Sequence, residues 1–134
     1  MIVYFDSKTG NVQRFMDKVV QITGWKAVRI AKDMQIQDEG HLVTFTTNFG
    51  QIPAVTEEFL KNNHTKIISV TSSGNRNWGR NFGIAGDKIS ASFDIPLAFK
   101  FELSGTMEDI NQFIEIIKNQ YYDSKRGSKK LDIA

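Results

Sequence analysis

Residues 2–20, IVYFDSKTGNVQRFMDKVV, combine the features of a strand, a polar loop and the start of a helix. The apolar run 2–5 contains β-branched and aromatic residues, which favour a strand, and it stops at the polar residues 6–11. From Val12 onward apolar residues recur at helical spacing, and Gly24 stands where a left-handed C-cap would end the helix. The stretch therefore predicts a strand that passes directly into a helix through a polar loop.

Strands and helices continue to alternate along the rest of the chain. Further strands are predicted at 27–30, 42–47, 66–71 and 97–103, and further helices from Pro53, over 82–92 and from Met107 to Tyr121. Strands that alternate with helices favour a parallel α/β sheet with helices on both faces. Only ten residues, 31–40, separate the second and third strands. A helical crossover needs more, so this connection is predicted to lack a full helix.

Length and composition indicate a single folded domain without disulfides. The 134 residues are 40% hydrophobic and 24% charged, which suits one globular domain. The chain has no cysteine, which excludes disulfides, iron–sulfur clusters, thiolate catalysis and cysteine-based zinc sites. His41 and His64 are isolated in the sequence, so we expect structural roles for both and no metal site.

The net charge of +2 comes from the C-terminal end. Residues 1–122 contain 13 basic and 13 acidic side chains, whereas residues 123–134 contain four and two. We therefore expect one domain over 1–122, followed by a basic and flexible tail over 123–134, and no nucleic-acid partner. No apolar run approaches the ~18 residues of a membrane span, and the N-terminus lacks the pattern of a signal peptide. These features predict a cytoplasmic protein without a membrane partner.

Three of the predicted strands end in polar loops that are rich in serine, threonine, asparagine and glycine. The loops cover residues 6–12, 46–51 and 72–80. In an open parallel sheet the carboxyl ends of the strands lie on one edge, and ligands bind there where the strand order reverses. The three loops are therefore predicted to surround one ligand site, and their convergence is more specific than any one of them.

The first loop contains the groups that a phosphate needs. Ser7 and Thr9 offer hydroxyl groups, and Gly10 allows close approach of the backbone. The helix that follows offers free N–H groups and the positive end of its dipole. The same residue types also begin ordinary helices. This loop alone therefore leaves a phosphate site and a plain helix cap equally open.

The second and third loops each carry an aromatic residue. Phe49 follows the third predicted strand, and Trp78 lies within Gly74-Asn75-Arg76-Asn77-Trp78-Gly79. Core tryptophans normally lie within regular elements, so a tryptophan among glycines and asparagines indicates a ligand contact. Two aromatic side chains beside a phosphate site suit a planar ring system.

These stretches resemble the NrdI family, the flavodoxin-like partner of class Ib ribonucleotide reductase. The resemblance is carried by Asp6-Ser7-Lys8-Thr9-Gly10-Asn11-Val12, by Thr46-Thr47-Asn48-Phe49-Gly50 with Pro53, by Ser73-Gly74-Asn75-Arg76-Asn77-Trp78-Gly79 with Phe82, and by Phe101-Glu102-Leu103-Ser104-Gly105-Thr106. It covers nearly the whole chain to about residue 120, and the third loop is its most specific part. It implies a flavodoxin-like, doubly wound sheet of five parallel strands in the order 2-1-3-4-5, with a shortened connection between strands two and three.

The resemblance implies bound FMN at the three loops. The phosphate would lie on Ser7, Thr9, Gly10, Asn11 and Val12, and the ring between Thr47, Asn48, Phe49 and Gly50 on one side and Asn75, Asn77, Trp78 and Gly79 on the other. Lys8, Thr46, Ser73, Gly74 and Phe82 complete the expected cofactor-binding set. Asn48, Phe49 and Gly50 are the candidates for tuning the flavin, and no residue is expected to be catalytic in its own right.

The resemblance further implies that the reduced flavin reacts with dioxygen. It would supply a superoxide-type oxidant to the dimanganese small subunit of class Ib ribonucleotide reductase, where the oxidant helps to generate a tyrosyl radical. The protein would then be a monomeric redox activator that an upstream electron donor reduces, rather than an enzyme that turns over alone. Lys8, Arg76 and Arg80 outnumber Asp6 in the loops, which predicts stabilisation of an anionic reduced flavin.

Two other functions stay open. A flavodoxin that carries single electrons would share the fold and the cofactor. A receiver-type signalling domain would need an acidic pair after the first strand and an aspartate after the third, whereas only Asp6 is present and Thr46-Thr47-Asn48 occupies the acceptor position. A dinucleotide enzyme is disfavoured because no G-x-G-x-x-G follows the first strand.

Overall fold

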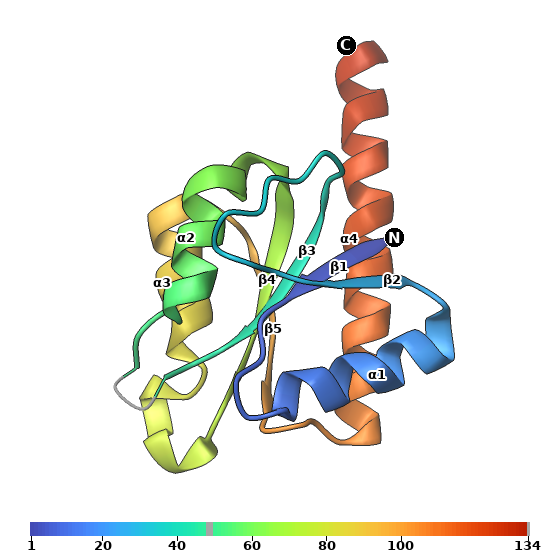
Figure 1. The fold of residues 1–134 in the computed structure, drawn as a ribbon. Coiled ribbons are helices and arrows are strands. Elements are labelled where there is room, and N and C mark those ends of the chain that lie inside the picture. The colour runs from blue at the N-terminus through green and yellow to red at the C-terminus, as the bar shows by residue number, and fades with distance from the viewer. Residues whose placement is uncertain (48–49, 134) are drawn as a thin grey trace.

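A parallel sheet forms the centre of this computed structural model, which describes the backbone of residues 1–47 and 50–133 and the side chains of 1–47 and 50–120. Within these residues, five strands lie in the order β2-β1-β3-β4-β5, and every neighbouring pair is parallel (Figure 1). The strands are β1 (Ile2–Phe5), β2 (Lys26–Arg29), β3 (Gly40–Phe45), β4 (Ile67–Gly74) and β5 (Leu97–Glu102). The predicted flavodoxin-like sheet and its strand order are confirmed.

Helices cover both faces of the sheet. Figure 1 shows α1 and α4 on one side and α2 and α3 on the other. The helices are α1 (Asn11–Thr23), α2 (Ala54–Asn63), α3 (Ile84–Phe93) and α4 (Met107–Ile133), with short 3-10 turns η1 (His64–Lys66) and η2 (Arg76–Asn81). Gly24 adopts a left-handed conformation at the end of α1, with φ of 72°, as the sequence predicts.

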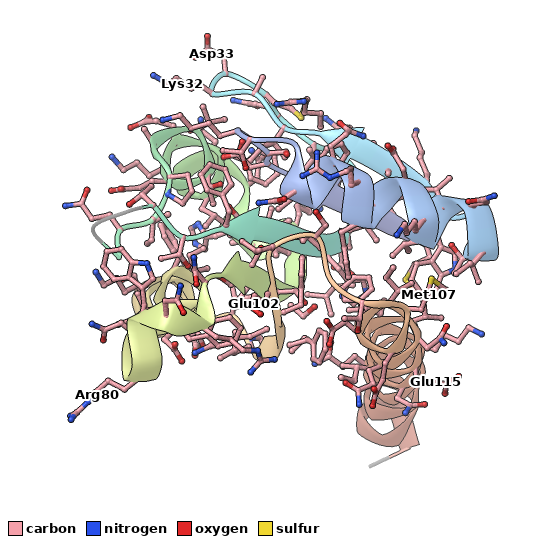
Figure 2. The ribbon with its side chains drawn as sticks, turned by 90° about the horizontal axis from the view of Figure 1, so that it is seen from below. Lys32, Asp33, Arg80, Glu102, Met107 and Glu115 are labelled. Atoms are coloured by element: carbon pink, nitrogen blue, oxygen red, sulfur yellow. The ribbon has the colours of Figure 1, made fainter. Side chains whose placement is uncertain are left out.

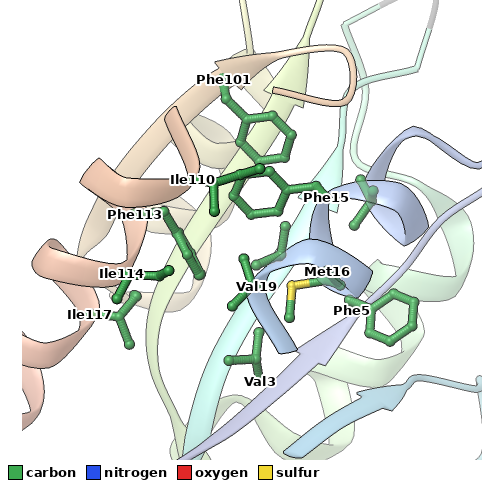
Figure 3. Packing of buried hydrophobic residues seen from close by; sticks show 12 residues of the cluster. Val3, Phe5, Phe15, Met16, Val19, Phe101, Ile110, Phe113, Ile114 and Ile117 are labelled. Carbon is green, nitrogen blue, oxygen red and sulfur yellow. The ribbon is translucent and has the colours of Figure 1, made fainter. Parts of the chain in front are cut away.

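The first core lies between the sheet and the α1–α4 pair (Figure 3). Phe15 of α1 stacks on Phe101 of β5 with ring centroids 3.9 Å apart, and Phe113 of α4 meets Phe15 edge-on at 5.1 Å. All three side chains are fully buried. This packing fixes α1, and therefore the loop that precedes it, against the last strand and the last helix.

The second core lies on the opposite face, where the chain lacks one crossover helix. Residues 31–39, between β2 and β3, contain turns and bends but no helix, as their number predicts. The buried Asn63, at the end of α2, holds this segment in place. Its side chain accepts a hydrogen bond from the N–H of Ile36 at 3.0 Å and donates to the carbonyls of Met34 at 2.8 Å and Phe59 at 2.9 Å. One polar side chain thus anchors the connection that replaces a helix.

Several boundaries differ from the sequence prediction. β4 continues to Gly74 rather than ending at Thr71, because β3 and β5 pair with it on both sides up to Ser73 and Gly74. Pro53 has an extended ψ of 141°, so it precedes α2 as its N-cap instead of forming its first turn. β3 starts two residues earlier than predicted and ends at Phe45.

The last helix is longer than its apolar stripe predicts. The sequence pattern fades from Asp123, whereas the backbone of α4 stays helical to Ile133. The predicted flexibility of residues 123–134 remains a prediction. Among the residues that the structure describes, no helix combines the length and the apolar character that crossing a bilayer requires.

Candidate functional site

A large cleft opens at the carboxyl edge of the sheet, the edge that Figure 2 views. Its volume is about 1160 Å³. The three predicted loops meet there, and the residues of the predicted set that line it are Ser7, Lys8, Thr9, Asn11, Val12, Thr46, Thr47, Ser73, Gly74, Asn75 and Trp78. Gly10, Gly50, Asn77, Gly79 and Phe82 do not line it, and Asn48 and Phe49 fall outside the described residues.

The loop before α1 combines a helix cap with unused hydrogen-bond donors. Ser7 Oγ accepts a hydrogen bond from the backbone N–H of Gln13 at 3.2 Å and so satisfies one N–H of the first turn of α1, whose N-cap residue is Gly10. Thr9 is exposed, and its hydroxyl makes no hydrogen bond within the described residues. The N–H groups of Asn11 and Val12 belong to the first turn of α1, where a helix supplies no acceptor. These donors and the dipole of α1 converge on the cleft, and together they suit an anion.

Two cations lie beside this loop. Lys8 and Arg29 both line the cleft, and the Arg29 guanidinium donates to the carbonyl of Ser7. Arg29 ends β2, the strand next to β1 in the sheet. The sequence prediction included Lys8 and missed Arg29, because nothing in the local sequence places the end of β2 beside the first loop.

The two other predicted cations do not line the cleft. Arg76 Nε lies 3.8 Å from Glu102 Oε1, and its guanidinium lies 4.8 Å from the centre of the Phe82 ring. Arg80 extends outward from η2 (Figure 2). One arginine thus contacts Glu102 and Phe82 and the other points away, while their effect on the charge around a bound ring stays a prediction.

The second loop is tied down by its own threonines and by α3. Thr47 Oγ1 accepts from the N–H of Gln51 at 3.1 Å, and Thr46 Oγ1 accepts from the N–H of Ala85 at 3.3 Å. The ammonium of Lys88 donates to the carbonyl of Gly50 at 2.6 Å. Thr46 and Gly50, on either side of positions 48 and 49, are thus tied to Ala85 and Lys88 of α3.

The third loop presents its tryptophan to the cleft. Trp78 is 46% exposed and lines the cleft, which confirms that it is not a core residue. Asn75 caps η2, because its side chain accepts from the N–H of Asn77 at 2.9 Å. Gly74 approaches the backbone of Gly83 so closely that a β-carbon on Gly74 would lie 2.6 Å from the Gly83 nitrogen. This contact brings the end of β4 directly against the start of α3.

Comparison of the amino-acid sequence with known proteins identifies the family of this chain. A model of the family described as "NrdI Flavodoxin like" matches residues 3–115. The chain belongs to this family. It is 44% identical over 114 residues to the SPbeta prophage-derived protein NrdI of Bacillus subtilis (strain 168), a match that covers 85% of this chain and 88% of the relative. It is also 44% identical over 131 residues to Protein NrdI of Bacillus licheniformis, which covers 97% of this chain and 95% of the relative.

The fold is also similar to a solved flavodoxin from Streptococcus pneumonia TIGR4. The TM-score is 0.62 at 18% identity, and the match covers 91% of this chain and 97% of the flavodoxin. At this identity the likeness concerns the fold. Membership of the NrdI family connects the chain to ribonucleotide reductase and implies a flavin cofactor.

The cleft of this NrdI family member fits a flavin that carries a phosphate. The donors at the start of α1, with Lys8 and Arg29, provide an anion site at one end. The exposed face of Trp78 provides an aromatic surface elsewhere in the same cleft. Polar groups and one aromatic surface around a single cavity are the chemistry that a planar ring joined to a phosphate requires.

Much of the NrdI cleft is lined by residues outside the predicted cofactor-binding set. They are Asp6, Arg29, Ile30, Phe45, Gln51, Ile52, Pro53, Ala54, Val55, Glu57, Asn81, Gly83 and Leu103. Asp6 and Gln51 lie within the predicted loops, and Phe45, Asn81 and the start of α2 lie within a few residues of them. Arg29, Ile30 and Leu103 follow or end other strands, and no local signal connects them to the loops. Asp6 is the most unusual of these residues because it is a carboxylate with only 7% of its surface exposed.

Both histidines lie away from the cleft. His41 is buried in β3, where its Nδ1 lies 2.7 Å from Ser69 Oγ, and burial lowers its pKa to about 4. His64 Nδ1 lies 3.0 Å from the carbonyl of Leu60, beside the ring of Phe93. Each histidine thus has a local packing partner, in line with the structural roles that we expect from the sequence.

Proposed function

We propose that this chain binds FMN in the cleft and activates oxygen for a class Ib ribonucleotide reductase. The observation that carries the proposal is the convergence of three loops on one cleft, with anion donors at one end and an exposed tryptophan among its lining residues. Family membership supports a flavin and a link to ribonucleotide reductase. The proposal goes beyond family membership in three respects: FMN as the flavin, dioxygen as its reactant and a manganese protein as the partner.

The phosphate would be held at the start of α1. Thr9 Oγ1 and the N–H groups of Asn11 and Val12 would donate to its oxygens, while Lys8 and Arg29 would balance its charge. Ser7 would contribute in two ways. Its oxygen accepts from Gln13 and holds the helix start in place, and its own O–H, which donates to no described residue, would be a further donor to the phosphate.

The ring would be held by the second and third loops. Trp78 offers a stacking face, and Thr46, Thr47, Ser73 and Asn75 line the cavity around it. Phe49 and Asn48 remain predicted contacts on the second loop. Ala85 and Lys88 hold Thr46 and Gly50, which lie on either side of these two positions.

A bound reduced flavin would supply single electrons for the reduction of dioxygen to superoxide, and an upstream donor would replace those electrons. The oxidant would need an open path to the dimanganese small subunit, and the exposed Trp78 and Leu103 lie at the border of the cleft. The chain thus acts as an activator within a complex, rather than as a stand-alone catalyst.

Three measurements on the purified protein test this function. Mass spectrometry of the released cofactor should identify FMN. The anaerobically reduced protein should then produce superoxide when air is admitted, measured as cytochrome c reduction that superoxide dismutase suppresses. With the manganese-loaded small subunit present, the tyrosyl radical should appear in the electron paramagnetic resonance spectrum. Free reduced FMN at equal concentration is the control.

Two results would contradict the proposal. A protein that neither carries nor takes up flavin would exclude the cofactor. A flavoprotein whose reduced form is stable in air, with widely separated one-electron potentials, would instead be an electron-carrying flavodoxin.

A further inference from the structure

Asp6 is a buried carboxylate at the border of the cleft. It follows β1, and 7% of its surface remains exposed. Its backbone N–H donates to the carbonyl of Val43 at 3.0 Å, so its main chain continues the pairing of β1 with β3. Among the residues whose side chains are described, Asp6 has no lysine, arginine or histidine within salt-bridge distance. A buried acid without a basic partner needs another source of stabilisation.

Two buried hydroxyl groups supply that stabilisation. Thr56 Oγ1 donates to Asp6 Oδ2 at 2.7 Å, and Thr44 Oγ1 lies 2.8 Å from Thr56 Oγ1. A hydroxyl has one proton, so Thr56 gives its proton to Asp6 and Thr44 must be the donor to Thr56. Neither threonine is exposed. Thr56 is also the third residue of α2, where the helix dipole favours a negative charge.

This arrangement uses only one oxygen of the carboxylate. Asp6 Oδ1 accepts no hydrogen bond from the described residues, and the atom is not fully buried. Asp6 also lines the cleft. Oδ1 is therefore an acceptor held in place by the Thr56 bond and available to a ligand in the cleft.

The position of Asp6 determines which part of a ligand can meet it. Ser7, the next residue, begins the anion site, and β3, the neighbouring strand, leads into Thr46 and Thr47. Asp6 thus lies between the phosphate loop and the second loop. A phosphate is repelled by its charge, and Glu57, also in the first turn of α2, repels a phosphate from the same side.

We infer that Asp6 Oδ1 accepts a hydrogen bond from a hydroxyl group of the chain that joins the flavin ring to its phosphate. In FMN this linker is a ribityl chain, whose hydroxyl groups are donors. Asp6 would then be the residue that selects a hydroxylated linker, while the phosphate loop selects the anion. The inference rests on the proposed FMN site and adds a determinant for the part of FMN that no predicted residue accounts for.

The test compares two ligands with two variants by calorimetry. The ligands are FMN and a flavin phosphate whose linker is an unsubstituted pentyl chain. The ratio of their dissociation constants measures discrimination for the hydroxyl groups. A hydrogen bond to a charged acceptor corresponds to a ratio of about tenfold or more in the wild-type protein. Asp6→Asn should lower that ratio by about tenfold, because it removes the charge of the acceptor and with it the contribution of one linker hydroxyl group.

Glu57→Gln is the matched control. It removes one negative charge from the same cleft, but Glu57 is exposed and no hydroxyl group within the described residues donates to it. Its ratio should stay within about twofold of the wild-type value. If Asp6→Asn and Glu57→Gln reduced the ratio equally, the effect would be one of general charge, and the inference would be overturned.

Wild-type measurements keep the inference testable if Asp6→Asn does not fold. Equal affinity of the wild-type protein for both ligands would overturn it without any variant. A wild-type protein that binds neither ligand would overturn the proposed FMN site as well, whereas FMN binding with an unchanged ratio in Asp6→Asn would overturn only the role of Asp6. Thr56→Val, which leaves the carboxylate but removes its donor, should give an intermediate ratio.

Discussion

Ser7 Oγ accepts a hydrogen bond from the backbone N–H of Gln13 at 3.2 Å, across the start of α1. The contact distinguishes two hydroxyl groups that the sequence makes look alike. Ser7 is buried and its oxygen supports the start of α1, whereas Thr9 is exposed and has no partner within the described residues. Removal of the Thr9 hydroxyl therefore leaves the support of the helix start intact.

Thr9→Val should weaken FMN binding without unfolding the protein. A hydrogen bond to a charged phosphate is worth about 1.5–3 kcal/mol, which corresponds to roughly tenfold to 150-fold in affinity. Isothermal calorimetry measures the change. Ser7→Ala is the comparison, and it should lower the free energy of unfolding by about 1 kcal/mol through loss of the cap. Unchanged FMN affinity in Thr9→Val would mean that Thr9 does not bind the phosphate and that this loop serves only to begin the helix.

Trp78→Ala should loosen the flavin and raise its fluorescence. Stacking of an aromatic side chain on a planar base is worth about 1–3 kcal/mol, and the indole also quenches the ring that it contacts. The other tryptophan, Trp25, packs against the first core and provides the control variant Trp25→Phe. Quenching that persists in Trp78→Ala but disappears in Trp25→Phe would mean that the wrong tryptophan has been assigned.

Arg29→Gln should weaken FMN binding but leave riboflavin binding unchanged. The guanidinium lies beside the phosphate loop, and riboflavin has no phosphate for it to contact. Because Arg29 is exposed, we expect no more than about a fivefold loss, which should shrink further at high salt. Lys32→Gln is a control on a neighbouring exposed cation that does not line the cleft. An equal loss for both ligands would indicate distortion of the loop through Ser7 instead.

Asn63→Ala should destabilise the fold by about 2–4 kcal/mol. It removes three hydrogen bonds and leaves the N–H of Ile36 and the carbonyl of Met34 without their partner. Urea unfolding gives the free energy, and hydrogen exchange at Ile36 should accelerate more than exchange in β4. The exposed neighbour Asn62 offers the control Asn62→Ala, for which we expect less than about 0.5 kcal/mol.

The stability of the protein should fall on acidification because of His41. Burial, with a smaller effect of the N-terminal amino group, lowers the pKa of His41 to about 4 from an ordinary value of 6.5. Between these pH values His41 binds a proton in the unfolded state but not in the folded state. The free energy of unfolding is therefore unaffected by His41 above pH 6.5, and it decreases by about 3 kcal/mol in total as the pH falls toward 4.

Urea titrations of wild-type protein and His41→Leu at several pH values isolate this contribution, since other groups titrate in both. The stability difference between the two proteins should change steadily between pH 7 and pH 4.5. A constant difference over that range would show that His41 does not control the acid sensitivity.

The sequence predicts those elements whose pattern is local. β1 is bounded by a sharp change from apolar to polar residues, and α1 has both a regular stripe and Gly24 at its end. By contrast, Ser72, Ser73 and Gly74 have loop composition but belong to β4, because strands on both sides pair with them. That pairing involves segments distant in the sequence and leaves no local pattern.

The same distinction applies to the site. The loops could be predicted because parallel strands must end on a common edge. The roles of individual charges could not, since Asp6 depends on Thr56, 50 residues away, and Arg76 contacts Glu102, 26 residues away. Nothing near Arg76 in the sequence indicates its contact with Glu102.

The contact between Gly74 and Gly83 limits how the cleft can vary. A β-carbon on Gly74 would lie 2.6 Å from the Gly83 nitrogen, and Gly83 has φ of +61° with a Lys100 carbon 2.9 Å from where its own β-carbon would lie. Gly74 therefore accepts no side chain while the Gly83 backbone stays in place, and a side chain at Gly83 is strained by its left-handed backbone and meets Lys100. For evolution, and for any library that diversifies this cleft, both positions are closed for separate reasons, and new ligand preferences must arise from the residues around them.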